Sequence, residues 1–297
     1  MIVSTEKLPE ECYSLLQEYE LREATEANLA EAEYLISWPS KLRSLVSKMP
    51  KLKVIQTLSA GVDDVPYDLL RNAVVLSNAG AYSTSVAEHA WALALALAKG
   101  VNVRKREPTY SITDQTALVL GAGGIGSEIA RIAKQGFRMR VIGVSRSFRR
   151  PEFFDEMLPM DQLKEAIRRG DVVFDTLPLN KSTRGVLNYS VLSLLKERAI
   201  LVNVGRAETI VEEDVMRVLK ERKDVRFGTD VFWRKDGKED FESELWNMDN
   251  FMGTYHTAGA SASGETLRKA MIKACNNLKN YLEKGESENV VKLSDYV

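Results

Sequence analysis

The segment TALVLGAGGIGSEIARIA, residues 116–133, decides the fold of this chain. An apolar run typical of a β-strand leads into Gly121-x-Gly123-x-x-Gly126, and a helical pattern follows. Gly121 permits a tight turn, Gly123 lets the backbone approach a pyrophosphate, and Gly126 lets the helix pack closely on the strand. The amino end of that helix offers free N–H groups to phosphates. We therefore predict a dinucleotide site made by the backbone of Gly121, Gly123, Gly124, Ile125 and Gly126.

Further strand-like runs continue this pattern toward the C-terminus, and helical patterns separate most of them. They lie near residues 117–120, 141–144, 172–175, 200–204, 226–229 and 251–254. Right-handed crossovers would join such strands into a doubly wound parallel sheet. The sequence therefore predicts an α/β protein whose residues 86–269 form a Rossmann-type dinucleotide-binding domain.

The N-terminal part has a shorter alternation of the same kind. Strand-like runs at residues 2–3, 34–36, 53–55 and 74–76 alternate with helical patterns beginning at Glu10 and Lys41. This predicts a smaller, flavodoxin-like α/β domain with a parallel sheet, which the family resemblance described below implies to be the substrate domain. A final helix over 264–284 and the tail 288–297 have no strand to follow, so we expect them to pack on this domain. Its predicted extent is 1–85 together with 270–297.

The segment SVAEHAWALALALAKG, residues 85–100, predicts a helix that is apolar on nearly every face and ends at Gly100. Such a helix is typical of burial between two packed bodies, and we interpret it as the bridge between the domains. It is too short, and too interrupted by Glu88 and His89, to span a bilayer.

Composition limits the possible partners and the cellular location. The 41 basic and 42 acidic residues give a net charge of −1, which offers no bulk attraction to nucleic acid or to an anionic membrane. Cys12 and Cys275 are far apart and have no His or Cys at metal-ligand spacing, so we expect neither a disulfide nor a metal site. The N-terminus lacks the apolar region of a signal peptide. A cytoplasmic protein is expected.

The end of the second strand of the Rossmann-type domain indicates which dinucleotide is bound. NAD enzymes usually place an acid there for the ribose 2′-hydroxyl, whereas this strand ends in Ser145-Arg146-Ser147. An arginine flanked by hydroxyls suits a 2′-phosphate. NADP is therefore predicted over NAD, which stays possible because Arg149 and Arg150 also fit a solvated basic loop.

Two side chains that follow later strands are suited to carbonyl chemistry. Arg206 follows the strand ILVNV, and His256 follows FMGTY. Arg206 could bind a substrate carboxylate and polarise the adjacent carbonyl, while His256 could donate a proton as hydride arrives. The alternatives are a surface ion pair for Arg206 and a satisfied core histidine for His256. His89, the only other histidine, lies in the apolar helix, where a structural role or one near the interdomain cleft is expected rather than proton transfer.

Eight segments in this order resemble the D-isomer-specific 2-hydroxyacid dehydrogenase family over almost the whole chain. They are QTLSAGVDDV (56–65), SVAEHAWALALAL (85–97), GAGGIG (121–126), LPLNKST (177–183), VNVGRA (202–207), DVF (230–232), SELW (243–246) and HTAG (256–259). Within the family, WPS (38–40), SAGVD (59–63) and VSRS (144–147) resemble the NADPH-linked glyoxylate/hydroxypyruvate reductases.

The resemblance implies further roles that the pattern of the residues alone does not. Backbone N–H groups around Ser59, Ala60 and Gly61 would hold the substrate carboxylate, together with Arg206, and Asp230 would meet the nicotinamide carboxamide. The other implied cofactor contacts are Leu177, Pro178, Thr183, Val204 and Gly259. The family also implies a homodimer built around the apolar helix and closure of the two domains over a small 2-oxo or 2-hydroxy acid.

One departure from the family concerns the acid partner of His256. The family normally carries a Glu five residues after the Asp of DVF, where a carboxylate favours the protonated imidazole. Lys235 occupies that position here. The segment looks about two residues longer than usual, so Asp236 or Glu239 could supply the carboxylate, or neither could. Ala207, in place of the usual glycine, is a milder departure.

Together these features predict reduction of a small 2-oxo acid, such as glyoxylate or hydroxypyruvate, by NADPH to the D-2-hydroxy acid. One alternative is NAD-dependent oxidation of a D-2-hydroxy acid, as in phosphoglycerate oxidation. Another is a non-catalytic, dinucleotide-sensing protein similar to the corepressors that share this fold, which Lys235 leaves open.

Overall fold

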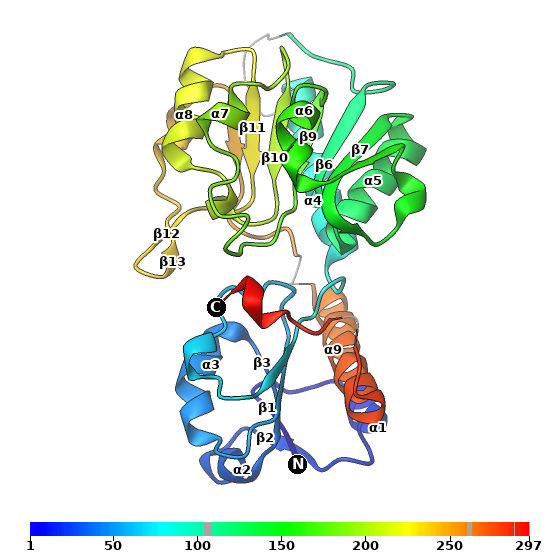
Figure 1. The fold of residues 1–297 in the computed structure, drawn as a ribbon, viewed down its shortest axis with the longest axis vertical. Helices are drawn as coiled ribbons and strands as arrows, with labels where there is room; N and C mark the ends of the chain where they lie inside the picture. Colours follow the sequence, from blue (N-terminus) through cyan, green and yellow to red (C-terminus); the bar gives the residue numbers. More distant parts are fainter. Residues whose placement is uncertain (102, 104–107, 260–262, 288, 297) are drawn as a thin grey trace. The chain divides into compact units, whose positions relative to one another are not determined.

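The computed structural model describes residues 1–101, 103, 108–259, 263–287 and 289–296, and the chain divides into two units (Figure 1). Unit 1 comprises Met1–Tyr82 and Ala260–Val297, and unit 2 comprises Ser83–Gly259. Unit 1 thus contains both ends of the chain. The ends of the predicted tail, Glu288 and Val297, lie outside the described residues.

Seven parallel strands form the sheet of unit 2, in the order β14-β11-β10-β9-β6-β7-β8. They are β6 (Thr116–Ala122), β7 (Arg140–Phe148), β8 (Glu156–Leu158), β9 (Val172–Asp175), β10 (Ile200–Asn203), β11 (Arg226–Thr229) and β14 (Phe251–Gly253). The chain builds outward from β6 in one direction and then from β9 in the other. The order therefore reverses between β6 and β9, as in a Rossmann-type sheet, and this crevice is where such sheets bind ligands. The predicted fold class is confirmed.

Helices cover both faces of this sheet. They are α4 (Ser83–Lys99), α5 (Gly124–Phe137), α6 (Leu163–Ile167), α7 (Tyr189–Leu192) and α8 (Glu212–Glu221). The long apolar helix α4 packs on α5, β10, β11 and β14. Its Trp91 ring lies 4.7 Å, between centroids, from both Phe137 and Phe174. Buried residues of α6, α7 and α8 form the core on the opposite face. No helix in the described ranges is long and apolar enough to cross a membrane.

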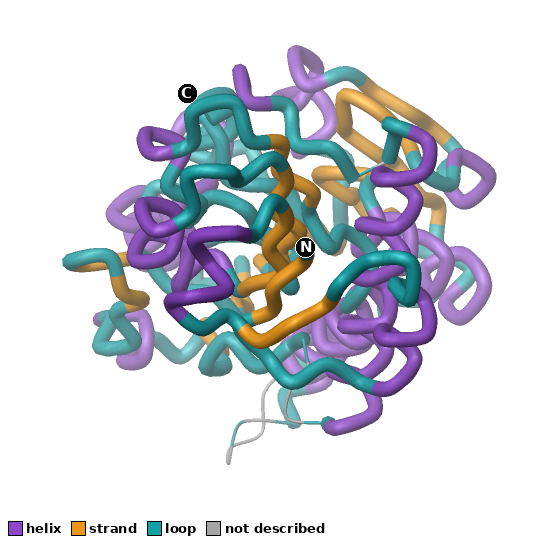
Figure 2. The backbone as a smooth tube through the Cα atoms, turned by 90° about the horizontal axis from the view of Figure 1, so that it is seen from below, coloured by secondary structure: helices purple, strands orange, loops and turns teal. Residues whose placement is uncertain are grey.

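Unit 1 contains five parallel strands in the order β2-β1-β3-β4-β5, which is the flavodoxin-like order. They are β1 (Ile2–Ser4), β2 (Leu21–Glu23), β3 (Tyr34–Ser37), β4 (Val54–Thr57) and β5 (Val74–Leu76). Helices lie on both sides of the strands (Figure 2). One face carries α1 (Glu10–Leu15) and α9 (Gly264–Lys284), and the other carries α2 (Glu26–Glu31) and α3 (Pro39–Leu45).

The C-terminal segments pack on unit 1, whose second part begins at Ala260 rather than at the predicted residue 270. Helix α9 contacts α1 and β4. Beyond it, the Val291 N–H donates to the Val75 carbonyl at 2.9 Å, and Val290 forms a bridge with Leu76. The tail therefore continues the edge of the five-stranded sheet at β5.

The prediction that the cysteines form no disulfide is wrong. Cys12 of α1 and Cys275 of α9 are both fully buried and are joined by a disulfide, with their Cα atoms 5.7 Å apart. The bond spans 263 residues of sequence, so spacing along the chain gave no signal. Packing of the last long helix on the first one brings the two thiols together.

Candidate active site

The glycine-rich turn joins the end of β6 to the start of α5. Gly121 has a left-handed φ of +89°, and a Cβ on Gly126 would overlap the Gly121 carbonyl oxygen. A Cβ on Gly123 would meet nothing within 4 Å, so the backbone there faces open space. The N–H groups of the first helical turn, at Gly124 and Ile125, have no partner within the helix. This open cradle of amides fits the pyrophosphate of a dinucleotide.

Thr176, which follows β9, holds the turn from the other side of the crevice. Its hydroxyl lies 2.7 Å from the Gly121 carbonyl oxygen and 2.9 Å from that of Leu120. The same hydroxyl would lie 3.0 Å from a Cβ on Gly126. A threonine after a strand gave no signal in the sequence, because its role depends on which strands are neighbours.

The carboxyl end of β7 bulges beside this turn. Leu120 pairs with Val144, and Ala122 pairs with Phe148, so four steps along β7 match two along β6. Opposite Gly121, β7 thus has the three residues Ser145, Arg146 and Ser147, of which Ser145 is half-buried and the other two are exposed. The three predicted 2′-phosphate contacts thus form one accessible segment at the carboxyl edge of the sheet.

The loop after β9 contains the predicted cofactor contacts Leu177, Pro178 and Thr183. Leu177 and Thr183 are buried, while Pro178 is exposed. The Thr183 hydroxyl donates to the Pro178 carbonyl at 2.5 Å and accepts from the Asn180 N–H at 2.9 Å. Thr183 therefore shapes the loop that presents Pro178. Val204, at the end of the neighbouring strand, is buried and donates its N–H to the Asp175 carbonyl at 3.1 Å.

Arg206 lies on the loop after β10 and is half-buried. Its carbonyl accepts from the Asn203 side chain at 3.0 Å, and one guanidinium N–H donates to the Gly205 carbonyl at 3.0 Å. A Cβ on Gly205 would come within 2.7 Å of the Leu177 carbonyl oxygen, so this loop packs closely on the loop after β9. Ala207 is buried at the start of a short 3₁₀ turn, Ala207–Thr209, which accommodates its methyl group.

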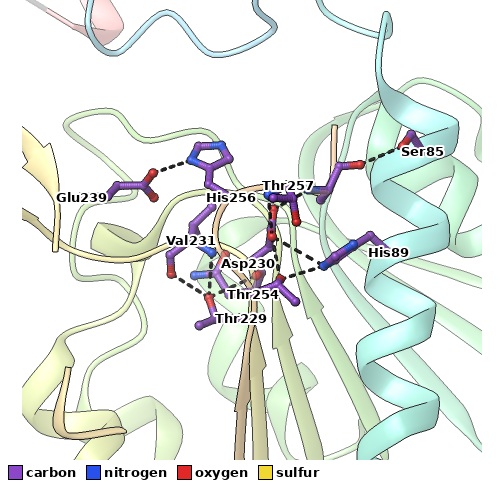
Figure 3. A network of polar contacts seen from close by, with 11 residues as sticks. Ser85, His89, Thr229, Asp230, Val231, Glu239, Thr254, His256 and Thr257 are labelled. Carbon is purple, nitrogen blue, oxygen red and sulfur yellow. Dashed lines mark hydrogen bonds and ion pairs between the residues drawn. The ribbon is translucent and has the colours of Figure 1, made fainter. Parts of the chain in front are cut away.

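His256 is held at the end of β14 by Asp230 (Figure 3). The His256 backbone has a left-handed φ of +52°, and its N–H donates to the Asp230 carbonyl at 2.8 Å. The buried Asp230 carboxylate accepts from the N–H groups of Thr257 and Ala258, both at 2.9 Å, and from the Thr254 hydroxyl at 2.6 Å. These bonds fix a strained conformation that presents the imidazole, a pattern common at functional sites.

His89 of α4 supports the same network. Its Nε2 lies 2.8 Å from the Thr254 hydroxyl and 3.5 Å from the Asp230 carboxylate. Because the Thr254 hydroxyl donates to Asp230, His89 donates to Thr254. The structural role predicted for His89 is thus to order the loop that carries His256.

Glu239 supplies the carboxylate that pairs with His256. Glu239 Oε2 lies 2.6 Å from His256 Nδ1, and Oε1 accepts from the Phe232 N–H at 3.0 Å. Glu239 ends a two-stranded hairpin, β12 (Arg234–Lys235) with β13 (Lys238–Glu239). The turn residues Asp236 and Gly237 have φ of +51° and +78°, as a tight hairpin turn requires.

The hairpin also accounts for Lys235 in the usual glutamate position. Lys235 forms an ion pair with Asp240, and Arg234 pairs across the hairpin with Glu239 in the strand register. The longer segment therefore places Lys235 on the hairpin, where it pairs with Asp240, and places Glu239 beside the imidazole of His256. Of the alternatives left open by the sequence, the structure selects Glu239 over Asp236.

The electrostatics link Glu239 to both predicted catalytic residues. Burial acts to raise the pKa of Glu239, but the hydrogen bond and charge of His256, the Phe232 N–H and the charge of Arg206 together lower it. Glu239 is therefore ionised at neutral pH and faces His256 Nδ1 as a charged hydrogen-bond acceptor. Unit 2 thus brings an arginine, a carboxylate and a half-exposed imidazole to the same edge of its sheet.

The predicted carboxylate-binding residues lie in unit 1, after β4. Ser59, Ala60 and Gly61 are half-buried, and the Ser59 hydroxyl donates to the Gly61 carbonyl at 2.6 Å. The Asn78 N–H donates to the Ser59 carbonyl at 2.9 Å and fixes the start of this loop. Gly259, the last predicted cofactor contact, is half-buried and ends unit 2.

Comparison with known proteins identifies relatives of the chain. The family model described as "D-isomer specific 2-hydroxyacid dehydrogenase, NAD binding domain" matches residues 74–258. Glyoxylate/hydroxypyruvate reductase B of Salmonella newport is 30% identical over 84% of this chain and 81% of its own length. D-3-phosphoglycerate dehydrogenase of Methanocaldococcus jannaschii is 29% identical over 98% of this chain, which spans only 59% of that relative.

Solved structures agree with this assignment. The crystal structure of a candidate formate dehydrogenase from Pyrobaculum aerophilum superposes with a TM-score of 0.82, at 32% identity, and the match covers 99% of both chains. The resemblance seen in the sequence is confirmed. The chain belongs to the D-isomer-specific 2-hydroxyacid dehydrogenase family of NAD(P)-dependent enzymes.

Proposed function

We propose that this enzyme uses NADPH to reduce a small 2-oxo acid, of the glyoxylate or hydroxypyruvate class, to the D-2-hydroxy acid. The observation that carries the proposal is the 2.6 Å contact between His256 and Glu239, in the field of Arg206. A proton donor and a guanidinium are the two kinds of group that suit the reduction of a carbonyl beside a carboxylate. The name of the Salmonella newport relative supports the same substrate class.

The roles of the side chains follow from this geometry. Since Nδ1 of His256 is bonded to Glu239, Nε2 is the nitrogen that gives a proton to the substrate oxygen. Glu239 accepts from the Nδ1–H group and so holds the imidazole ring in this orientation. Arg206 binds the carboxylate in a fork and draws electron density from the carbonyl, and the amides of Ser59–Gly61 would share the carboxylate. The bound nicotinamide supplies the hydride.

The cofactor is held by the cradle of Gly121–Gly126, the loop at Leu177–Thr183, Val204 and Gly259, and Asp230 would meet the nicotinamide carboxamide. Preference for NADPH is assigned to Ser145, Arg146 and Ser147, which form an exposed segment where NAD enzymes carry an acid.

Arg146→Ala tests this preference. We expect it to raise KM for NADPH about tenfold and to leave KM for NADH within about twofold, because NADH has no 2′-phosphate for the guanidinium to bind. Arg138→Ala, which removes a distant surface pair with Asp114, is the control. Equal effects of Arg146→Ala on the two cofactors would reject the assignment.

A panel of 2-oxo acids with NADPH and NADH tests the proposed reaction. Oxidation of NADPH by glyoxylate or hydroxypyruvate is expected, and oxidation of D-3-phosphoglycerate with NAD is expected to be slower. If the dinucleotide binds tightly and no acid of the panel is turned over, a sensing role replaces this proposal. The family resemblance also implies a homodimer built around α4, which sedimentation equilibrium tests.

A further inference from the structure

Asp175 is a fully buried carboxyl group that the proposed chemistry does not use. It ends β9 between Leu120 of β6 and Asn203 of β10. Its Oδ1 accepts from the Leu177 N–H at 3.0 Å, and its Oδ2 lies 2.5 Å from the Thr209 hydroxyl. Through these bonds it touches both the loop after β9 and the loop after β10.

The Thr209 hydroxyl lies between two oxygens. It is 2.5 Å from Asp175 Oδ2 and 2.7 Å from the carbonyl oxygen of Arg206. A hydroxyl has one hydrogen, so it can donate to only one of these acceptors. If Asp175 were ionised, only the Thr209 hydroxyl could supply a hydrogen. Thr209 Oγ1 would then lie in close contact with either Asp175 Oδ2 or the Arg206 carbonyl oxygen with no hydrogen between the two atoms, which is unfavourable.

A proton on Asp175 removes this conflict. The carboxylic acid then donates to Thr209 Oγ1, and the Thr209 hydroxyl donates to the Arg206 carbonyl. Each short contact contains one hydrogen, and Oδ1 still accepts from the Leu177 N–H.

We propose that Asp175 is protonated in the native enzyme and is a positioning residue that orders, through Thr209, the backbone of Arg206. The part that concerns Arg206 rests on the proposed function, because it is read through binding of the 2-oxo acid. The protonation of Asp175 does not depend on any activity.

The surroundings of Asp175 are consistent with a neutral group. Burial raises the pKa of Asp175 to about 7, against smaller lowering effects of the Thr209 and Leu177 hydrogen bonds. The strand residues beside it, Leu120 and Asn203, do not titrate. The charged side chains of the loop that faces it are Arg206 and Glu208, and neither is among the causes of the shift.

Infrared spectroscopy tests the proton directly. The difference spectrum of wild type minus Asp175→Asn, at pH 6 and in the absence of substrate, is expected to contain the C=O stretch of a protonated carboxyl group. Asp171→Asn is the matched control, because Asp171 lies just before the same strand but is bonded to Lys196 and to the Thr116 N–H. Absence of the band, or an equal band in the control, overturns the proposal.

Kinetics test the link to Arg206. Thr209→Val is expected to raise KM for the 2-oxo acid about tenfold and to leave KM for the dinucleotide within about twofold. Asp175→Val should act in the same direction. Asp175→Asn should restore KM, because its amide donates to Thr209 while its carbonyl accepts from Leu177. Failure of this rescue, or equal changes in both KM values, contradicts positioning.

The two assays separate the two ways of failing. If no 2-oxo acid is reduced by the wild type, the proposed function fails and the infrared band still decides the protonation of Asp175. If the wild type is active and the band is missing, only the inference about Asp175 fails.

Discussion

Asp175 and Asp230 occupy similar places in the sheet of unit 2 but have different surroundings. Each comes at the end of a parallel strand, β9 or β11, and each is almost completely buried. Asp230 accepts from two backbone N–H groups and a hydroxyl, with His89 nearby. Asp175 has one N–H donor and a hydroxyl that also contacts a carbonyl. The number of hydrogen-bond donors around a buried carboxyl group, rather than burial alone, therefore decides whether the group acts only as an acceptor or carries a proton.

Each of the two carboxyl groups supports the loop that follows the neighbouring strand. Asp230, after β11, holds the His256 loop after β14, and Asp175, on β9, reaches the Arg206 loop after β10. Parallel neighbours make this possible, because their carboxyl ends meet at one edge. The comparison thus predicts strong dependence of catalysis on Asp230 and a weaker, proton-linked dependence on Asp175.

The largest effect is expected at the residue that Asp230 holds. His256→Asn should lower kcat by about 10²–10⁴-fold, because the proton donor is lost, and should leave dinucleotide binding unchanged. Steady-state kinetics and a fluorescence titration with NADPH measure the two quantities. A kcat within about twofold of wild type would remove His256 from the chemistry.

Asp230→Asn is expected to have the next largest effect. Its amide would face a backbone N–H, so at least one donor loses its acceptor and the unfolding free energy falls by about 1–3 kcal/mol. We expect kcat to fall about 100-fold as the His256 loop relaxes from its left-handed conformation. Asp175→Asn is the contrast, since there the amide replaces a donor. Equal losses of kcat and of unfolding free energy in the two variants would contradict the proposed difference between Asp230 and Asp175.

Glu239→Gln is expected to have an intermediate effect on activity. Removing the charge beside His256 should lower kcat at pH 7.5 about tenfold. The loss should shrink only in acid, as pH falls through the lowered pKa of Glu239 and the wild type also loses this charge. Asp240→Asn is the control, since Asp240 pairs with Lys235 on the same hairpin. A loss that is constant with pH would show that Glu239 acts only through packing.

The smallest effect concerns the pH dependence of stability. The pKa of Asp175 is about 7 in the folded chain, against an ordinary value of 3.8. Between these values the native state keeps a proton that the unfolded state releases. This contribution is therefore complete below pH 3.8 and is lost as pH rises toward 7. Asp175→Asn should lack it, and urea unfolding at several pH values measures the difference. Parallel curves would mean that Asp175 is ionised in both states.

The sequence predicted the elements that carry strong periodic patterns. The final helix lies at the predicted residues 264–284, and the glycine turn joins a strand to a helix as expected. Strands β2 and β8 were not predicted, because each has only three residues and lies at a sheet edge with little burial. Their short, half-exposed sequences carry no clear alternation.

The candidate site was only partly predictable, for a related reason. Arg206 and His256 could be proposed because their types and places after strands have chemical meaning. Glu239 could be weighed but not selected, since the choice depends on where the turn at Asp236-Gly237 reverses the chain. Asp175 and Thr209 lie 34 positions apart, and the disulfide joins residues 263 apart. Such pairings become visible only when strand order and helix packing are known.

We propose that this enzyme transfers hydride to the carbonyl carbon of a 2-oxo acid. Hydroxypyruvate reduced with NADPH that carries deuterium at the transferable C4 position tests it most directly, with the product analysed by mass spectrometry and chiral chromatography. We expect D-glycerate with deuterium on C2. Product of the opposite configuration, or a product without deuterium, would contradict it.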